Sequence, residues 1–150
     1  GKYIDKLPYK VWIVCGDSEM AEGSMYEAME ISAHYALSNL VAIVDVNKLG
    51  QRGETQLGHD MDAYKARFEA FGWHAIVVDG HDVEAIDAAY AEAVAVTDKP
   101  VAVLAKTNKG HGISFTQGAP GWHGKAMKPE EAERALAELG NPAGDIVISV

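Results

Sequence analysis

Four short runs of apolar residues alternate along the chain with longer segments in which apolar residues recur at helical spacing. The short runs have the length of β-strands and are rich in valine and isoleucine, and they cover residues 11–15, 41–46, 74–78 and 101–105. The longer segments predict helices at residues 23–37, 61–71, 83–93 and 129–139. A fifth apolar run, residues 145–150, is compatible with an edge strand and with a truncation boundary.

Capping residues support two of the predicted helices. Asp82 stands just before the third helix, where its carboxylate can accept hydrogen bonds from the first unpaired N–H groups. Pro129 opens the fourth helix at a position where no N–H is needed, and Gly140 follows its end.

Continuous apolar strands that alternate with helices are typical of a parallel sheet with helices on both faces, so we expect an α/β fold. The crossovers between its strands should be right-handed. Ligands of such sheets bind outside the carboxyl ends of the strands. The loops after the first, second and fourth runs, which hold Asp17, Asn47 and residues 109–123, should therefore share one edge.

Length and composition indicate a single globular domain over residues 1–150, with 48% apolar residues. The sequence shows neither a signal peptide nor an apolar run long enough to span a membrane, which favours the cytoplasm. A net charge of −9 argues against nucleic acid and anionic membranes as partners. The single cysteine, Cys15, excludes an intramolecular disulfide and lies in an apolar run, so we expect it in the core.

Two oxygen-bearing side chains follow successive strands, Asp17 after the first and Asn47 after the second. Mg²⁺ prefers oxygen ligands in octahedral geometry, and a backbone carbonyl of residues 47–50 can add a third protein ligand. The helix that begins near Gly23 should point its positive end at the same edge, where it favours phosphate. Either residue alone is more often a helix cap or a turn residue, so the prediction depends on the pair.

Several segments resemble the transketolases in order and spacing. Gly16-Asp17-Ser18-Glu19 and Asn47 resemble the thiamine-diphosphate motif of that family, a Gly-Asp-Gly followed after about thirty residues by Asn. The similarity runs from about residue 11 to residue 139, through the segments 22–23, 39–43, 45–51, 70–74, 78–81, 105–110 and 122–125. The resemblance implies the fold of a thiamine-diphosphate-binding domain, the part that holds the diphosphate.

The resemblance also implies a ligand set for the metal, Mg²⁺ or Ca²⁺. Asp17 and Asn47 would bind it through their side chains and Leu49 through its carbonyl oxygen. Ser18 stands where the family has a glycine whose N–H meets the diphosphate. The Ser18 hydroxyl either reaches a phosphate or weakens cofactor binding, because glycine permits a closer backbone approach.

Further roles follow from the resemblance alone. Glu22 and Glu27 match glutamates that lie near the family's dimer interface and link its active sites, and His123 matches a histidine near the diphosphate and the sugar substrate. Lys109 would contact the diphosphate, and Gln51 and Lys125 would approach the cofactor. Without the resemblance, these residues read as solvated glutamates, a surface lysine and a loop histidine.

The implied reaction moves a two-carbon ketol unit from a ketose phosphate to an aldose phosphate through thiamine diphosphate, in the pentose phosphate pathway. The chain is short for a complete transketolase, so we expect a companion subunit or domain that bears the pyrimidine-binding site, in a homo- or hetero-oligomer such as a dimer. The chain alone is expected to be inactive, because the glutamate that activates the aminopyrimidine belongs to that companion.

Two alternatives remain open at this stage. One is another thiamine-diphosphate enzyme: a deoxyxylulose-phosphate synthase, a phosphoketolase or a component of a 2-oxo-acid dehydrogenase. The second is a folded fragment or scaffold without catalysis. A dinucleotide-binding domain fits poorly, because no Gly-x-Gly-x-x-Gly follows the first strand.

Overall fold

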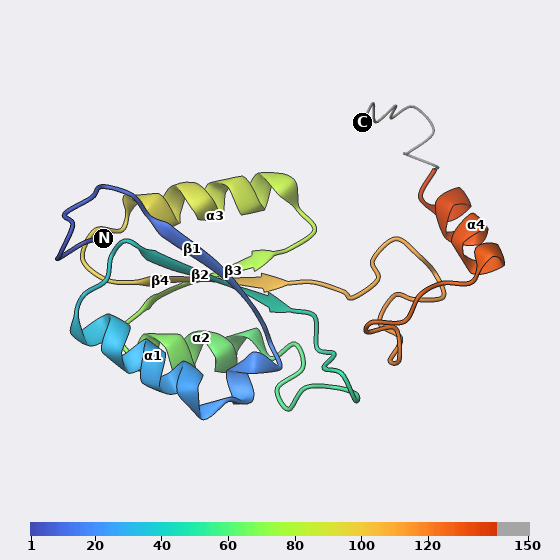
Figure 1. Ribbon diagram of the computed structural model, residues 1–150, viewed down its shortest axis with the longest axis horizontal. Helices are drawn as coiled ribbons and strands as arrows, with labels where there is room; N and C mark the ends of the chain where they lie inside the picture. The colour runs from blue at the N-terminus through green and yellow to red at the C-terminus, as the bar shows by residue number, and fades with distance from the viewer. Residues whose placement is uncertain (141–150) are drawn as a thin grey trace.

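Four parallel strands form a single sheet in the order β1-β2-β4-β3 (Figure 1). The computed structural model describes residues 1–140, so the apolar run at 145–150 lies outside the described residues. The strands are β1 (Val11–Gly16), β2 (Leu40–Val46), β3 (His74–Asp79) and β4 (Val101–Lys106). Their bounds agree with the predicted strands to within a residue at each end, and the parallel pairing confirms the predicted fold class.

Helices lie on both faces of the sheet, as the sequence pattern predicts. Figure 1 shows α1 (Gly23–His34) and α2 (Met61–Ala70) on one face and α3 (Val83–Ala95) on the other. Asp82 caps α3 as predicted, because its Oδ1 accepts hydrogen bonds of 3.0 Å from the N–H groups of Glu84 and Ala85. No helix among the described residues is long and apolar enough to cross a membrane.

Two apolar clusters hold the helices on the sheet, one on each face. Side chains alternate along β2, so Val44 and Val46 face α1 and α2 while Val41 faces α3. The indole N–H of Trp73 donates to the carbonyl of Met29 at 2.9 Å, which ties the start of β3 to α1. Most residues of the central strands β2 and β4 are buried, so these strands hold the carboxyl edge of the sheet in place.

β1 departs from the expectation that the sheet is covered on both faces. It is an edge strand that pairs only with β2, and the Val14 side chain is 74% exposed. Trp12 packs edge-on against Tyr90 of α3, with ring centroids 5.2 Å apart, yet it remains 40% exposed. β1 is exposed for two reasons. It lies at the end of the sheet, so no described strand pairs with its outer side, and α3 packs mainly over β3 and β4.

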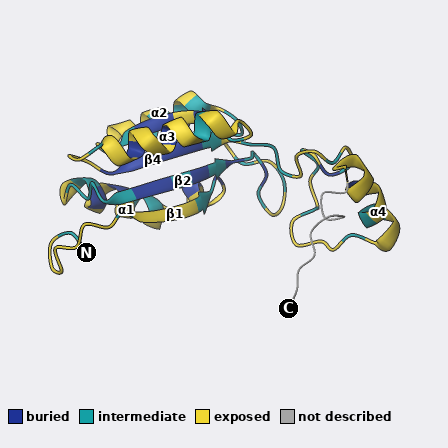
Figure 2. Cartoon of the chain, turned by 90° about the horizontal axis from the view of Figure 1, so that it is seen from above, coloured by how far each residue is buried: buried dark blue, intermediate teal, exposed yellow. Residues whose placement is uncertain are grey.

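The chain after β4 leaves the sheet at its carboxyl edge and leads to α4 (Pro129–Glu138), which begins at the predicted proline. Figure 2 shows this segment to one side of the sheet, with α4 largely exposed. Glu138 of α4 accepts hydrogen bonds from the backbone N–H and the hydroxyl of Ser114, and Arg134 stacks on Phe115 at 4.7 Å. These contacts connect α4 to the loop that precedes it.

Candidate functional site

The carboxyl ends of β1, β2 and β4 open into a cavity of about 780 Å³. Parallel strands bring these three ends together, although they are far apart in sequence. The cavity is lined by seven residues that the sequence predicted for the site: Asp17, Ser18, Asn47, Leu49, Gln51, Lys109 and His123. Glu22, Glu27 and Lys125 do not line it.

Asp17 is the most deeply buried acid of this cavity, with 3% of its surface exposed. Its Oδ2 accepts hydrogen bonds from the N–H of Lys48 at 2.7 Å and from the hydroxyl of Thr55 at 3.2 Å. Burial raises the pKa of Asp17, and the neighbouring Asp45 carboxylate adds to this effect. No lysine or arginine of residues 1–140 forms an ion pair with Asp17. A bound cation would therefore offset both the burial of the Asp17 charge and its repulsion by Asp45.

Asn47 is held by hydrogen bonds on both ends of its amide. Its Oδ1 accepts from the N–H of Leu49 and its Nδ2 donates to Asp45 Oδ2, each at 3.0 Å. Asp45 in turn accepts a hydrogen bond from the Thr107 hydroxyl at the end of β4. This network orients the Asn47 amide and leaves its oxygen one further lone pair for a ligand.

The side chain and the backbone of Leu49 have separate roles. The side chain is 5% exposed and anchors the loop after β2, as the residue type alone suggests. The residue nevertheless lines the cavity, where the resemblance expects its carbonyl oxygen.

A short 3₁₀ turn, η1 (Glu19–Ala21), separates Ser18 from α1. No residue of α1 lines the cavity, so the start of this helix does not form part of its wall. Glu19 does line it, and its carboxylate accepts a hydrogen bond of 2.5 Å from the N–H of Gly16. Burial and the Glu19 charge raise the pKa of the half-buried Cys15 thiol, which favours the neutral form and a structural role.

Lys109 and His123 approach the cavity from the segment after β4. The Lys109 Nζ lies 2.9 Å from His123 Nδ1. A protonated lysine can only donate, so Nδ1 must accept and the imidazole proton is assigned to Nε2. This pair presents one cationic group and one neutral N–H donor.

The remaining predicted residues lie on the surface. Glu22 is the N-cap residue of α1, and both Glu22 and Glu27 are exposed. Lys125 is also exposed and lies over the Trp122 ring, 3.9 Å from its centroid. The structure therefore does not bring these three side chains to the described cavity.

Three residues of the network, Asp45, Thr107 and Thr55, were assigned no role from the sequence. Asp45 could have been noticed, because it is the only charged residue of β2 and a partly buried carboxylate favours hydrogen-bond partners. The two threonines could not, since they reach the site only through the folding of their loops.

A family profile described as transketolase, thiamine diphosphate binding domain, matches residues 3–149. The chain belongs to this family. Transketolase of Homo sapiens is 48% identical over 139 residues, which are 93% of this chain and 22% of that protein. Transketolase-like protein 2 of Mus musculus is 50% identical over 141 residues, or 94% of this chain and 22% of that protein. The predicted family is thereby confirmed.

Solved transketolases share the fold. The enzyme from Campylobacter jejuni superposes with a TM-score of 0.76 at 30% identity, covering 91% of this chain and 21% of that chain. Transketolase from Pichia stipitis, in complex with sedoheptulose 7-phosphate, gives a TM-score of 0.75 at 32% identity, covering 87% and 19%. This transketolase-family chain spans about a fifth of the length of the relatives it matches.

Proposed function

We propose that this chain is the part of a transketolase that holds Mg²⁺ and the diphosphate of thiamine diphosphate. The complete enzyme would transfer a two-carbon ketol unit from a ketose phosphate to an aldose phosphate. The observation that carries the proposal is the meeting of Asp17, Asn47 and Lys109 at one cavity, in a chain of the transketolase family.

The donor atoms suit a hard divalent cation. A carboxylate and an amide oxygen are ligands that Mg²⁺ accepts, the carbonyl of Leu49 would be the third, and Ca²⁺ accepts the same oxygens with looser geometry. Asp17 is buried without an ion-pair partner among the described residues, which supports a cation as its missing partner. Asn47 is oriented before any ligand arrives, because Asp45 and Leu49 hold its amide.

The opposite wall suits the diphosphate and the substrate. Lys109 supplies a positive charge on a flexible stem for a phosphate oxygen. His123, with its proton on Nε2, would donate a hydrogen bond to a substrate oxygen. Thiamine diphosphate, when bound, supplies the electron sink for the ketol group. The protein's share is to bind, to orient and to hold these donors in place.

A companion subunit or domain completes the proposal. The exposed apolar surface of β1 favours a covering partner, and the exposed Glu22 and Glu27 are accessible to one. The pyrimidine-binding site and the activating glutamate are assigned to that companion. The 150-residue chain alone is therefore expected to show no ketol transfer, and steady turnover by the purified chain would contradict this.

Calorimetric titration of the purified chain with thiamine diphosphate at saturating MgCl₂ tests cofactor binding. The native chain should bind, and Asp17→Ala should lose binding because the metal loses its buried carboxylate. Asp98→Ala is the matched control, since the Asp98 carboxylate is exposed beside Lys99 just before β4, at the opposite edge of the sheet. Absence of binding by the native chain, or equal binding by Asp17→Ala, would refute the metal-site assignment.

A further inference from the structure

The loop after β2 folds into a short hairpin, residues 48–55, against the carboxylate of Asp17. The N–H of Thr55 donates to the carbonyl of Lys48 at 2.9 Å, and the N–H of Gly50 donates to the carbonyl of Gly53 at 2.8 Å. Lys48 takes a left-handed backbone conformation with φ of 60° as the hairpin begins. The two residues that close the hairpin are also the two hydrogen-bond donors to Asp17.

Both donors converge on the same oxygen of Asp17. Oδ2 accepts the Lys48 N–H and the Thr55 hydroxyl, which occupies its two lone pairs. The backbone N–H of the adjacent Ser18 also stabilises the Asp17 carboxylate, and neither of the two hairpin donors reaches Oδ1. The hairpin thus holds Oδ2, and Oδ1 is the oxygen that its two donors leave for a ligand.

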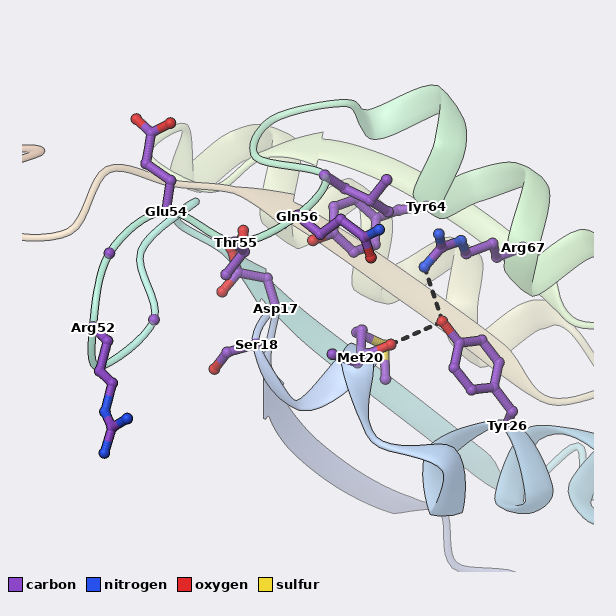
Figure 3. Close-up of a pocket in the computed structure, with 14 residues that line it drawn as sticks. Asp17, Ser18, Met20, Tyr26, Arg52, Glu54, Thr55, Gln56, Tyr64 and Arg67 are labelled. Atoms are coloured by element: carbon purple, nitrogen blue, oxygen red, sulfur yellow. Dashed lines mark hydrogen bonds between the residues drawn. The ribbon is translucent and has the colours of Figure 1, made fainter.

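Asp17 forms part of the wall between two cavities. On one side is the 780 Å³ cavity that contains Asn47. On the other is a cavity of about 390 Å³, to which Thr55, Tyr64 and Arg67 contribute. Figure 3 shows Thr55 next to Asp17 within this second group, and Thr55 does not line the first cavity. The Thr55 hydroxyl therefore belongs to the side of Asp17 that is away from Asn47.

We propose that Thr55 is a positioning residue for the metal site. Its hydroxyl, with the Lys48 N–H, fixes the rotation of the Asp17 carboxylate so that Oδ1 faces the cavity shared with Asn47. The carboxylate torsion of an aspartate is broad when no donor restrains it, whereas Mg²⁺ requires near-octahedral placement of its ligands. The inference rests on the proposed metal site and adds to it a residue that never touches the metal.

Two substitutions separate the hydroxyl from the shape of the side chain. Thr55→Val removes the donor at almost constant volume, and Thr55→Ser keeps the donor while removing the methyl group. Thr97→Val is the matched control, because Thr97 is exposed in the loop before β4, at the opposite edge of the sheet.

The experiment is a calorimetric titration with MgCl₂ of the full chain in excess thiamine diphosphate. Thr55→Val should weaken metal binding on the order of tenfold, the range found when partners of metal ligands are removed. Thr55→Ser and Thr97→Val should stay within about threefold of the native chain, since a retained donor keeps the carboxylate in place. Thermal unfolding without metal shows that each variant is folded.

Electron paramagnetic resonance of bound Mn²⁺ gives a second readout, in which Thr55→Val should change the spectrum through a less regular coordination. Equal metal affinity and an unchanged spectrum in Thr55→Val would overturn the inference while leaving the proposed function intact. An equal loss in Thr55→Ser would also overturn it, because the methyl group and not the hydroxyl would then be responsible. A native chain that binds no metal would refute the proposed function and this inference with it.

Discussion

Asp17 is a residue whose environment opposes its charge. It is buried, its pKa is raised by that burial and by Asp45, and the hydrogen bonds from Lys48, Thr55 and Ser18 only partly compensate. Residues that serve a binding site are often retained at some cost in stability. The cost should be measurable in the chain without metal.

Asp17→Asn should raise the melting temperature of the metal-free chain at pH 7. A raised pKa means that the folded chain binds this proton more tightly than the unfolded chain. The contribution of Asp17 to the free energy of unfolding is therefore fully present below the ordinary pKa of 3.8 and is lost as the pH rises through the raised pKa. The advantage of Asp17→Asn should accordingly shrink toward pH 4.

Scanning calorimetry in EDTA from pH 4 to pH 7 checks this expectation. Asp98→Asn provides the control, because that exposed carboxylate lies at the far edge of the sheet. A difference between native chain and Asp17→Asn that does not change with pH would contradict the raised pKa.

The sequence predicted the residues at strand ends better than it predicted their supports. Asp17 and Asn47 could be found because parallel strands place consecutive carboxyl ends at one edge. Thr55 and Thr107 could not, because their hydroxyls reach Asp17 and Asp45 only once a hairpin and a second strand are in place. Hydrogen-bond partners so far apart in sequence leave no periodic signal.

At the scale of elements, the segment from β4 to α4 is connected by a small polar cluster. Glu138 accepts hydrogen bonds from Ser114 and from Arg134, and these bonds lower the pKa of Glu138 below its ordinary value of 4.5. A lowered pKa means that the stabilisation from the Glu138 carboxylate is present above pH 4.5 and is lost as the pH falls through the folded-state pKa of Glu138.

Glu138→Gln should loosen the loop before α4 without affecting the sheet. Its amide accepts hydrogen bonds more weakly than a carboxylate, so amide hydrogen exchange of residues 110–118 should accelerate several-fold. Exchange in β2 and β4 should not change, because those strands are held by the apolar clusters. Glu133→Gln, at an exposed position of the same helix, is the control. Unchanged exchange in the loop would show that Glu138 does not hold it.

The helices and strands could be predicted from the apolar periodicity and the capping residues, but two features of the fold could not. The exposure of β1 could not be predicted, because an edge strand and a central strand of a parallel sheet have the same apolar composition. The η1 turn could not be predicted either, since three residues are too few to show a period.

At the scale of the whole molecule, exposed apolar side chains gather along the edge strand β1. A parallel edge strand with exposed apolar side chains offers its free backbone groups and its apolar surface to another strand. The proposed companion subunit or domain would account for this surface.

Val14→Lys should prevent self-association of the chain and its assembly with a companion. The Val14 side chain is 74% exposed, so the substitution should change the free energy of unfolding by no more than about 0.5 kcal/mol. Val83→Lys is the matched control, because Val83 is 77% exposed on α3, on a different element. Analytical ultracentrifugation of both variants measures the effect. Identical sedimentation of both at high concentration would show that β1 is not the associating surface.

The assembly of the site from three strand ends has a consequence for kinetics. Asp17 and Asn47 become neighbours only after β1 and β2 pair across the α1 crossover, a contact between distant parts of the chain that forms slowly. A metal that requires both Asp17 and Asn47 cannot bind before these strands have paired, so it cannot speed up their pairing. Mg²⁺ with thiamine diphosphate should therefore slow unfolding and leave the refolding rate nearly unchanged, which stopped-flow fluorescence of the buried Trp73 can follow. The lifetime of the folded chain, more than its speed of formation, would then depend on the ligand.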